Sequence, residues 1–113
     1  MKNIIKSILV LLLVFSATQN LYAAKDTLVV KASIMCESCK KNIEEGLRFE
    51  KGIKLATVDV EAKTVTIIYS SEKTNPDALR KAISKLGYDA DDVPADKKAY
   101  DNLEKCCKKD GHH

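Results

Sequence analysis

The segment between residues 75 and 87 carries both a start and a stop signal for an amphipathic helix, and it constrains the fold most. Asn75 is a good helix cap, and Pro76 suits the first turn, where its missing N–H is not needed. Gly87 can adopt the left-handed conformation that ends many helices. Apolar residues recur between these signals at helical spacing: Leu79, Ala82, Ile83 and Leu86. The rest of the chain must therefore supply a surface that buries this stripe.

Runs of β-forming residues predict that surface. Polar and apolar residues alternate from Thr27 to Ile34, which is typical of a strand with one buried face. The runs at 53–60 and 64–69 are rich in β-branched and aromatic residues, and the Glu61-Ala62-Lys63 segment between them predicts a hairpin. Tyr88 to Val93 has room for a short acidic edge strand. The face of the first strand that we expect to be buried carries Leu28, Val30, Ala32 and Ile34.

A second amphipathic helix is predicted to begin near Ser38 and to end before Gly52. Cys39, Ile43 and Leu47 recur at steps of four on its apolar side. The order β-α-β-β-α-β predicts an α+β, ferredoxin-like fold, with a four-stranded antiparallel sheet and both helices on one face. Apolar spacing continues between residues 95 and 108, so a short C-terminal helix is expected to dock on this domain.

The N-terminus has the features of a secretory signal peptide. Lys2 and Lys6 precede an apolar run of 8 residues from Ile8 to Phe15, and a short polar segment leads to Ala23 and Ala24. A permanent membrane helix needs about 20 apolar residues, so we expect no stable membrane insertion after signal removal. The predicted organisation is a signal peptide at 1–23, a domain at 24–93 and a helical tail at 94–113, in a periplasmic or secreted protein.

Charge gives no indication of a nucleic-acid partner. Lys2 and Lys6 leave with the signal peptide, so 19 basic residues become 17 against 16 acidic ones. Nucleic-acid binding usually requires a clustered positive excess, whereas the charges here are intermixed in sign. They are typical of a solvated surface.

The Cys36-Glu37-Ser38-Cys39 segment lies where the first strand passes into the first helix. Two intervening residues allow both sulfurs to face one small space, and the helix N-terminus with Lys40 and Lys41 favours the thiolate form. Two thiolates suit a soft d10 ion with low coordination number, which indicates Cu(I) or Hg(II). Calcium and magnesium prefer oxygen ligands. Zinc would need further ligands, of which the tail offers Cys106, Cys107, His112 and His113.

Several segments together resemble the heavy-metal-associated domain family. They are Ile34-Met35-Cys36-Glu37-Ser38-Cys39, Gly52-Ile53 with Val58-Asp59-Val60, Thr64-Val65-Thr66-Ile67, and Leu86-Gly87-Tyr88. Members include copper chaperones, amino-terminal modules of copper-transporting ATPases and the periplasmic mercury-binding protein. The resemblance covers about residues 27–92 and implies a binding and transfer role, with a membrane metal transporter or another such domain as partner.

The chain departs from the family pattern beside the first cysteine. The family usually has Gly-Met and one further residue there, whereas this chain has Ser33, Ile34 and Met35. The resemblance then implies that Ile34 takes the buried packing role of the family's methionine. Met35 would lie in a more exposed place beside the sulfurs, where a thioether contact to the metal is a further hypothesis. Tyr88 matches an aromatic residue that packs near the metal loop in bacterial members, and it is equally compatible with an ordinary core position.

Other interpretations of the cysteines stay open. An even number of cysteines in an exported chain can form disulfides. A thiol-disulfide redox protein could also use Cys36 and Cys39, but the chain lacks tryptophan and places Pro76 and Pro94 at expected helix starts. No arrangement of residues indicates an enzyme. Cys106 and Cys107 are equally compatible with packing and with an auxiliary metal role.

Overall fold

Three predicted strands pair into one antiparallel sheet in the computed structural model, which describes residues 25–109. Strand β3 (Thr64–Ser70) lies between β1 (Lys25–Lys31) and β2 (Ile53–Asp59). Val65 of β3 lies opposite Val30 of β1 and Val58 of β2. All three valines are buried, so this register aligns the apolar faces of the strands on one side of the sheet.

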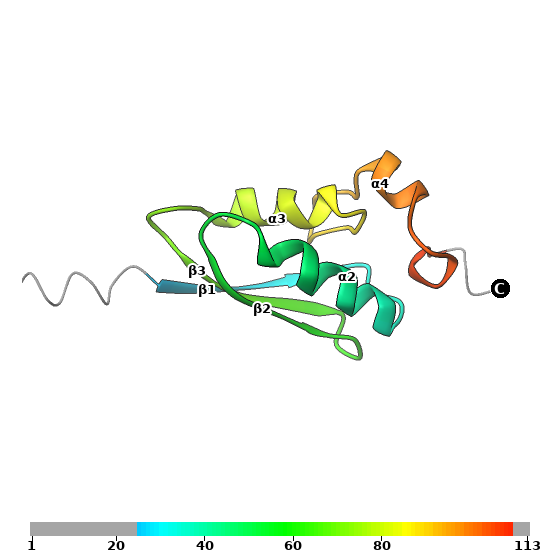
Figure 1. Cartoon of the computed structure of the whole chain (residues 1–113), viewed down its shortest axis with the longest axis horizontal. Helices are drawn as coiled ribbons and strands as arrows, with labels where there is room; N and C mark the ends of the chain where they lie inside the picture. Colours follow the sequence, from blue (N-terminus) through cyan, green and yellow to red (C-terminus); the bar gives the residue numbers. More distant parts are fainter. Residues whose placement is uncertain (1–24, 110–113) are drawn as a thin grey trace, which may run out of the picture.

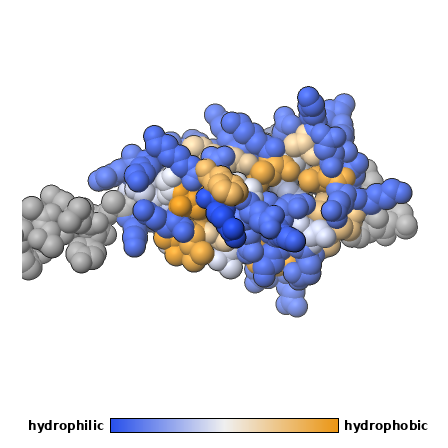
Figure 2. All heavy atoms as spheres, viewed as in Figure 1, coloured by the Kyte–Doolittle hydropathy of each residue, from blue (hydrophilic) through white to orange (hydrophobic). Residues whose placement is uncertain are grey.

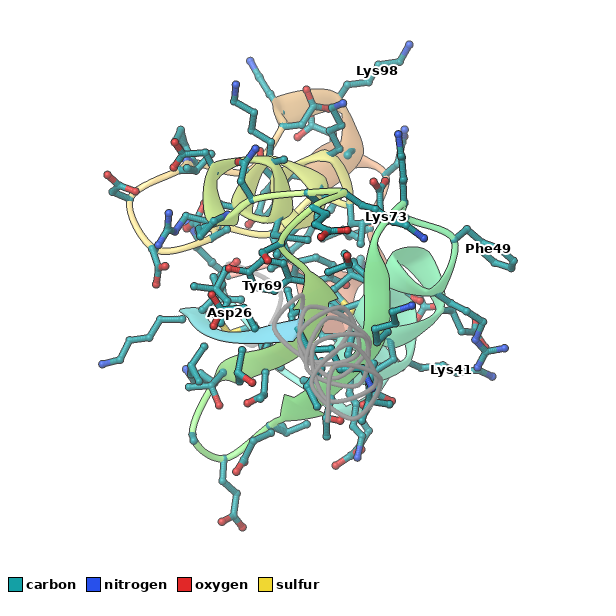
Figure 3. The ribbon with its side chains drawn as sticks, turned by 90° about the vertical axis from the view of Figure 1, so that its left-hand side faces the viewer. Asp26, Lys41, Phe49, Tyr69, Lys73 and Lys98 are labelled. Atoms are coloured by element: carbon teal, nitrogen blue, oxygen red, sulfur yellow. The ribbon has the colours of Figure 1, made fainter. Side chains whose placement is uncertain are left out.

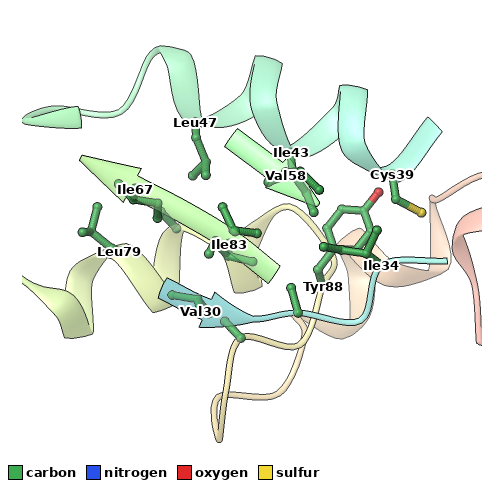
Figure 4. Packing of buried hydrophobic residues seen from close by; sticks show 14 of the residues in the cluster. Val30, Ile34, Cys39, Ile43, Leu47, Val58, Ile67, Leu79, Ile83 and Tyr88 are labelled. Carbon is green, nitrogen blue, oxygen red and sulfur yellow. The ribbon is translucent and has the colours of Figure 1, made fainter. Parts of the chain in front are cut away.

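Both main helices cover that apolar side. Figure 1 shows α2 (Glu37–Arg48) and α3 (Pro76–Lys85) packed side by side over the same face of the sheet. The predicted ferredoxin-like arrangement is therefore confirmed. The core lies between the helices and the sheet. Its largest fully buried side chains on these elements include Ile43, Leu47, Ile67, Leu79 and Ile83, all of which are labelled in Figure 4.

The local signals for α3 act as the sequence predicts. The Asn75 side chain accepts a hydrogen bond from the backbone N–H of Ala78 at 2.9 Å. Pro76 is the first residue of the helix. Gly87 has φ +105°, a conformation that L-residues with a Cβ rarely adopt. The cap and the stop together fix the length of α3 and the direction in which the chain leaves it.

The short edge strand predicted between Tyr88 and Val93 does not form, so the sheet has three strands in the described residues and not four. Between Tyr88 and Val93 the structure has isolated bridges, in which Ala90 pairs with Ala32 and with Val93. Asp91 has φ +52°, which bends the backbone out of the extended conformation that a strand requires. Its N–H still donates to the carbonyl of Lys31 at 2.7 Å, so this segment touches the end of β1 without extending the sheet.

The predicted C-terminal helix is divided into two short pieces. Helix α4 (Lys97–Asp101) begins at the Asp96 cap, and the 3-10 helix η1 (Lys105–Cys107) follows an extended Glu104. Figure 1 shows this tail curling around the end of the domain where α2 begins. No helix in residues 25–109 has both the length and the apolar character needed to cross a bilayer. The predicted signal peptide lies outside the described residues.

The outer surface is mostly polar. Hydrophilic residues cover much of the face seen in Figure 2, with apolar spheres between them. Phe49 is the most exposed of the large apolar side chains described, and it points away from the body of the domain with Lys41 in Figure 3.

A side-chain hydrogen bond also links two strands of the sheet. The Tyr69 hydroxyl on β3 donates to Asp26 on β1 at 3.4 Å.

Candidate metal site

Cys36 and Cys39 lie at the start of α2, as predicted. Cys36 is the capping residue, with extended backbone (φ −157°), and its carbonyl accepts the N–H of Cys39 at 3.1 Å. This turn brings the two sulfurs to 3.4 Å from each other. Cys39 is fully buried, and Figure 4 shows it beside Tyr88 and Ile34, whereas Cys36 is half-buried. One sulfur is thus fixed in the core and the other lies nearer to solvent.

The tail brings two more sulfurs to the same place. The Cys36 sulfur lies 2.9 Å from that of Cys106 and 3.7 Å from that of Cys107. The Cys106 and Cys107 sulfurs are 4.0 Å apart, and Cys107 also interacts with the Cys39 thiol. Cys107 is buried and Cys106 half-buried. None of the four cysteines is part of a disulfide, so the structure brings the paired and the tail cysteines together as thiols in one cluster.

Polar contacts on both sides of the cysteines hold the tail in place. The Tyr100 hydroxyl accepts the backbone N–H of Lys109 at 2.9 Å, and the Lys109 ammonium pairs with Asp89. The other oxygen of Asp89 accepts the N–H of Ala95 at 2.9 Å, where the tail begins. The backbone of α4 passes so close to Gly87 that a Cβ there would lie 3.0 Å from Tyr100 N. Contacts between the tail and the domain therefore fix the position of Cys106 and Cys107.

The pKa of the Cys36 thiol lies below those of the two tail thiols. Burial acts to raise the Cys36 pKa, but contacts with Cys106, with the Cys39 N–H and with the other thiols outweigh burial and lower this pKa from 9.0 to about 7. The same contact with Cys36 raises the pKa of Cys106, and burial chiefly raises that of Cys107. The lowered pKa predicted for Cys36 is confirmed. The neighbouring sulfurs and the helix-start N–H of Cys39 lower it.

Ile34 and Met35 occupy the positions that the resemblance implies. Ile34 is fully buried under the loop, and Met35 is half-buried beside it. The backbone N–H of Met35 lies 3.5 Å from the Cys39 sulfur, so Met35 contacts this sulfur through its backbone. A thioether ligand from Met35 stays a prediction.

Tyr88 lies on the buried side of the cluster, and the exposed residue Asn42 borders it. Tyr88 is fully buried, and its hydroxyl accepts a hydrogen bond from the Asn42 amide at 3.2 Å. The same amide lies 3.9 Å from the Cys107 sulfur. Burial raises the pKa of Tyr88, so its hydroxyl stays neutral and polar beside the thiols. Asn42 escaped the sequence interpretation, although its position three residues after Cys39 places it on the same side of a helix.

The remaining polar contacts of the tail also escaped prediction. No local sequence pattern indicates that Asp89 pairs with Lys109, because the pair forms only when the segment after α4 returns toward Asp89. The lysine and the carboxylate lie 20 residues apart. His112 and His113, the other ligands offered by the tail, lie outside the described residues.

Comparisons with known proteins agree with the geometry. The profile of the heavy-metal-associated domain family matches residues 24–89, which include Cys36 and Cys39 but not the tail cysteines. A copper-exporting P-type ATPase of Staphylococcus saprophyticus is 42% identical over 55 residues, which are 49% of this chain and 7% of that protein. The human copper-transporting ATPase 2 is 31% identical over 64 residues, 57% of this chain and 4% of that protein. The chain thus corresponds to less than a tenth of these relatives.

Solved structures agree as well. The CopZ metallochaperone superposes with a TM-score of 0.54 at 27% identity, and the match covers 57% of this chain and 98% of that one. Oxidized MerP from Ralstonia metallidurans shares the fold, with a TM-score of 0.56 at 22% identity over 59% of this chain and 94% of that one. Such domains are metal-binding and chaperone-type. The chain belongs to the heavy-metal-associated domain family.

Proposed function

We propose that this chain carries a soft d10 metal ion, Cu(I) or Hg(II), through the thiolates of Cys36 and Cys39. The observation that carries the proposal is the 3.4 Å separation of these two sulfurs at the start of α2, inside the range that matches the family. Soft ions prefer thiolate ligands, and the lowered pKa of Cys36, about 7, favours the thiolate that a metal needs. The role is binding and transfer, without catalysis.

Transfer proceeds by exchange of ligands. A thiolate of the acceptor forms a bond to the ion, a bond from the ion to a cysteine of this chain breaks, and the ion keeps its oxidation state. Cys36 is the better leaving ligand, because it is half-buried whereas Cys39 is fixed in the core. The acceptor is a membrane metal transporter or another heavy-metal-associated domain, which approaches the end of the domain where α2 begins.

The first ion to test is Cu(I), since the relatives at 42% and 31% identity are named copper transporters. Soft-ligand affinity alone does not separate copper from mercury, because both ions favour thiolates. The physiological ion is decided by growth of a deletion strain: sensitivity to copper supports copper, and sensitivity to mercury supports mercury.

The proposed setting is the periplasm or the exterior of the cell. Lys2, Lys6 and the apolar run from Ile8 to Phe15 support a signal peptide at residues 1–23. Cell fractionation and N-terminal sequencing of the mature protein test this. A protein recovered from the cytoplasm with Met1 still present would contradict export.

The binding experiment is a competition titration of the reduced protein with a chromogenic Cu(I) chelator. The double variant Cys36→Ser/Cys39→Ser should lose tight binding of one ion per chain. The matched control is Cys106→Ser/Cys107→Ser, which changes as many thiols and keeps the pair, and should still bind. Unchanged affinity in the first variant would exclude Cys36 and Cys39 as the ligands.

A further inference from the structure

The tail cysteines lie outside the range that matches the family, yet they lie against its cysteine pair. The profile match ends at residue 89, and Cys106 and Cys107 follow on η1. The sulfurs of Cys36, Cys106 and Cys107 all lie within 4.8 Å of one another, and Cys39 adds a fourth sulfur at 3.4 Å from Cys36. Cys36 is therefore the central member of a four-sulfur cluster.

The separations between the sulfurs indicate a high coordination number. For metal–sulfur bonds of about 2.3 Å, the sulfurs lie ~4.6 Å apart on a linear ion, ~4.0 Å on a trigonal ion and ~3.8 Å on a tetrahedral ion. The four measured separations run from 2.9 to 4.0 Å. All are too short for a linear pair. The sulfurs would have to move less to bind one ion through three or four ligands than to bind it as a linear pair. The main change would be a widening of the Cys36 to Cys106 sulfur distance by about 1 Å.

The burial of Cys107 and the contacts that anchor the tail also favour a metal site over chance proximity of the sulfurs. Cys107 is 1% exposed and faces Cys39, Tyr88 and Cys36. Asn42 lies 3.9 Å from its sulfur and can donate to a metal-bound thiolate there, as partners outside the first shell of metal sites do. The Lys109 contacts to Tyr100 and Asp89 hold the far end of η1.

We propose that Cys106 and Cys107 complete the metal site, so that a soft d10 ion is held by three or four thiolates with Cys36 shared between the two pairs. The inference rests on the proposed function, since Cys36 and Cys39 supply two of the ligands. A four-thiolate arrangement also suits zinc, which a cysteine pair alone does not satisfy. The site can therefore hold a wider range of ions than the pair.

The tail then also controls release. An acceptor thiolate that forms a bond to the ion must displace Cys106 or Cys107 first, because η1 covers the half-buried Cys36. The bond from the ion to the tail sulfur breaks, and the freed thiolate takes a proton from water, with no change of oxidation state. Retention is stronger with the tail in place, and transfer includes its displacement.

X-ray absorption of the reduced full chain with one equivalent of Hg(II) tests the sulfur count. We expect three or four sulfur neighbours in the wild type and two in Cys106→Ser/Cys107→Ser. The same double variant should release Cu(I) to a chelator about 10-fold faster or more, in line with the usual cost of weakening a metal site. Lys105→Ser, an exposed position on η1, is the matched control and should behave as the wild type.

Two further readings keep the outcome decisive. Circular dichroism of Cys106→Ser/Cys107→Ser checks that this variant is folded. The variant Tyr100→Phe/Lys109→Ala loses the contacts that hold the tail but keeps every sulfur, so this variant should also release Cu(I) faster than the wild type. Two sulfur neighbours in the wild type, or equal release rates in all chains, would overturn this inference and leave the Cys36–Cys39 carrier intact. Loss of binding only in Cys106→Ser/Cys107→Ser would instead overturn the proposed function.

Discussion

Replacing Gly87 by alanine should both destabilise the domain and loosen the tail. Gly87 has φ +105°, outside the regions open to residues with a Cβ, so the backbone strain is on the order of 1–3 kcal/mol. The new Cβ would also lie 3.0 Å from the carbonyl carbon of Ala99 and from the backbone N of Tyr100, and neither backbone atom can move without shifting α4. For a domain of this size, each kcal/mol lowers Tm by about 4–8 °C.

The assay is urea unfolding of the reduced, metal-free protein, with hydrogen exchange at the tail amides. Gly46→Ala is the matched control. Its Cβ would meet the tip of the Leu86 side chain, which can rotate away, and alanine favours a helix interior by about 1 kcal/mol. We expect Gly87→Ala to unfold at lower urea and to exchange faster at the N–H of Cys107, which donates to the Glu104 carbonyl. Stability within about 0.5 kcal/mol of the wild type, with unchanged tail exchange, would refute the reasoning.

Three further predictions concern Asn75, Glu44 and Cys36. Asn75→Ala removes the side-chain acceptor at the start of α3 and should cost about 1 kcal/mol by urea unfolding, whereas Asn75→Asp keeps the cap and should cost little. Glu44→Ala leaves the N–H of buried Val58 without its acceptor at 2.9 Å and should lower the free energy of unfolding by about 1–3 kcal/mol. Glu44→Gln keeps an acceptor oxygen and should recover most of this stability. Equal losses of stability in the two variants would exclude this hydrogen bond as the cause. Because neighbouring thiols and the Cys39 N–H outweigh burial and lower the pKa of Cys36 to about 7, alkylation of Cys36 in the metal-free protein should rise with pH through a midpoint near 7, as mapped by mass spectrometry. A midpoint near the ordinary value of 9.0 would contradict the cluster geometry.

The elements with local signals could be predicted from the sequence. Asn75, Pro76 and Gly87 define α3 by their own backbone chemistry, and the alternating run of the first strand defines its buried face. The fourth strand could not be predicted correctly, because the left-handed conformation of Asp91 depends on its side chain accepting the Lys31 N–H and the Arg80 guanidinium N–H, both at 2.9 Å. Those partners come from other elements of the fold.

The candidate site divides in the same way. The spacing of Cys36 and Cys39 before a helical stripe predicts their proximity, since one turn of backbone sets it. The proximity of Cys106 to Cys36 could only be offered as one of two alternatives, because 70 residues separate them. It depends on the extended Glu104 that divides the tail and on the close passage of α4 over Gly87.

Heteronuclear NMR of the full chain with one equivalent of ¹⁹⁹Hg(II) tests the central claim most directly, because couplings between the metal and the cysteine β-protons identify each ligand by residue. The account predicts couplings to both Cys36 and Cys39, with further couplings to Cys106 or Cys107 if the tail completes the site. Mercury bound without coupling to Cys36 and Cys39, or coupled to the tail cysteines alone, would contradict it.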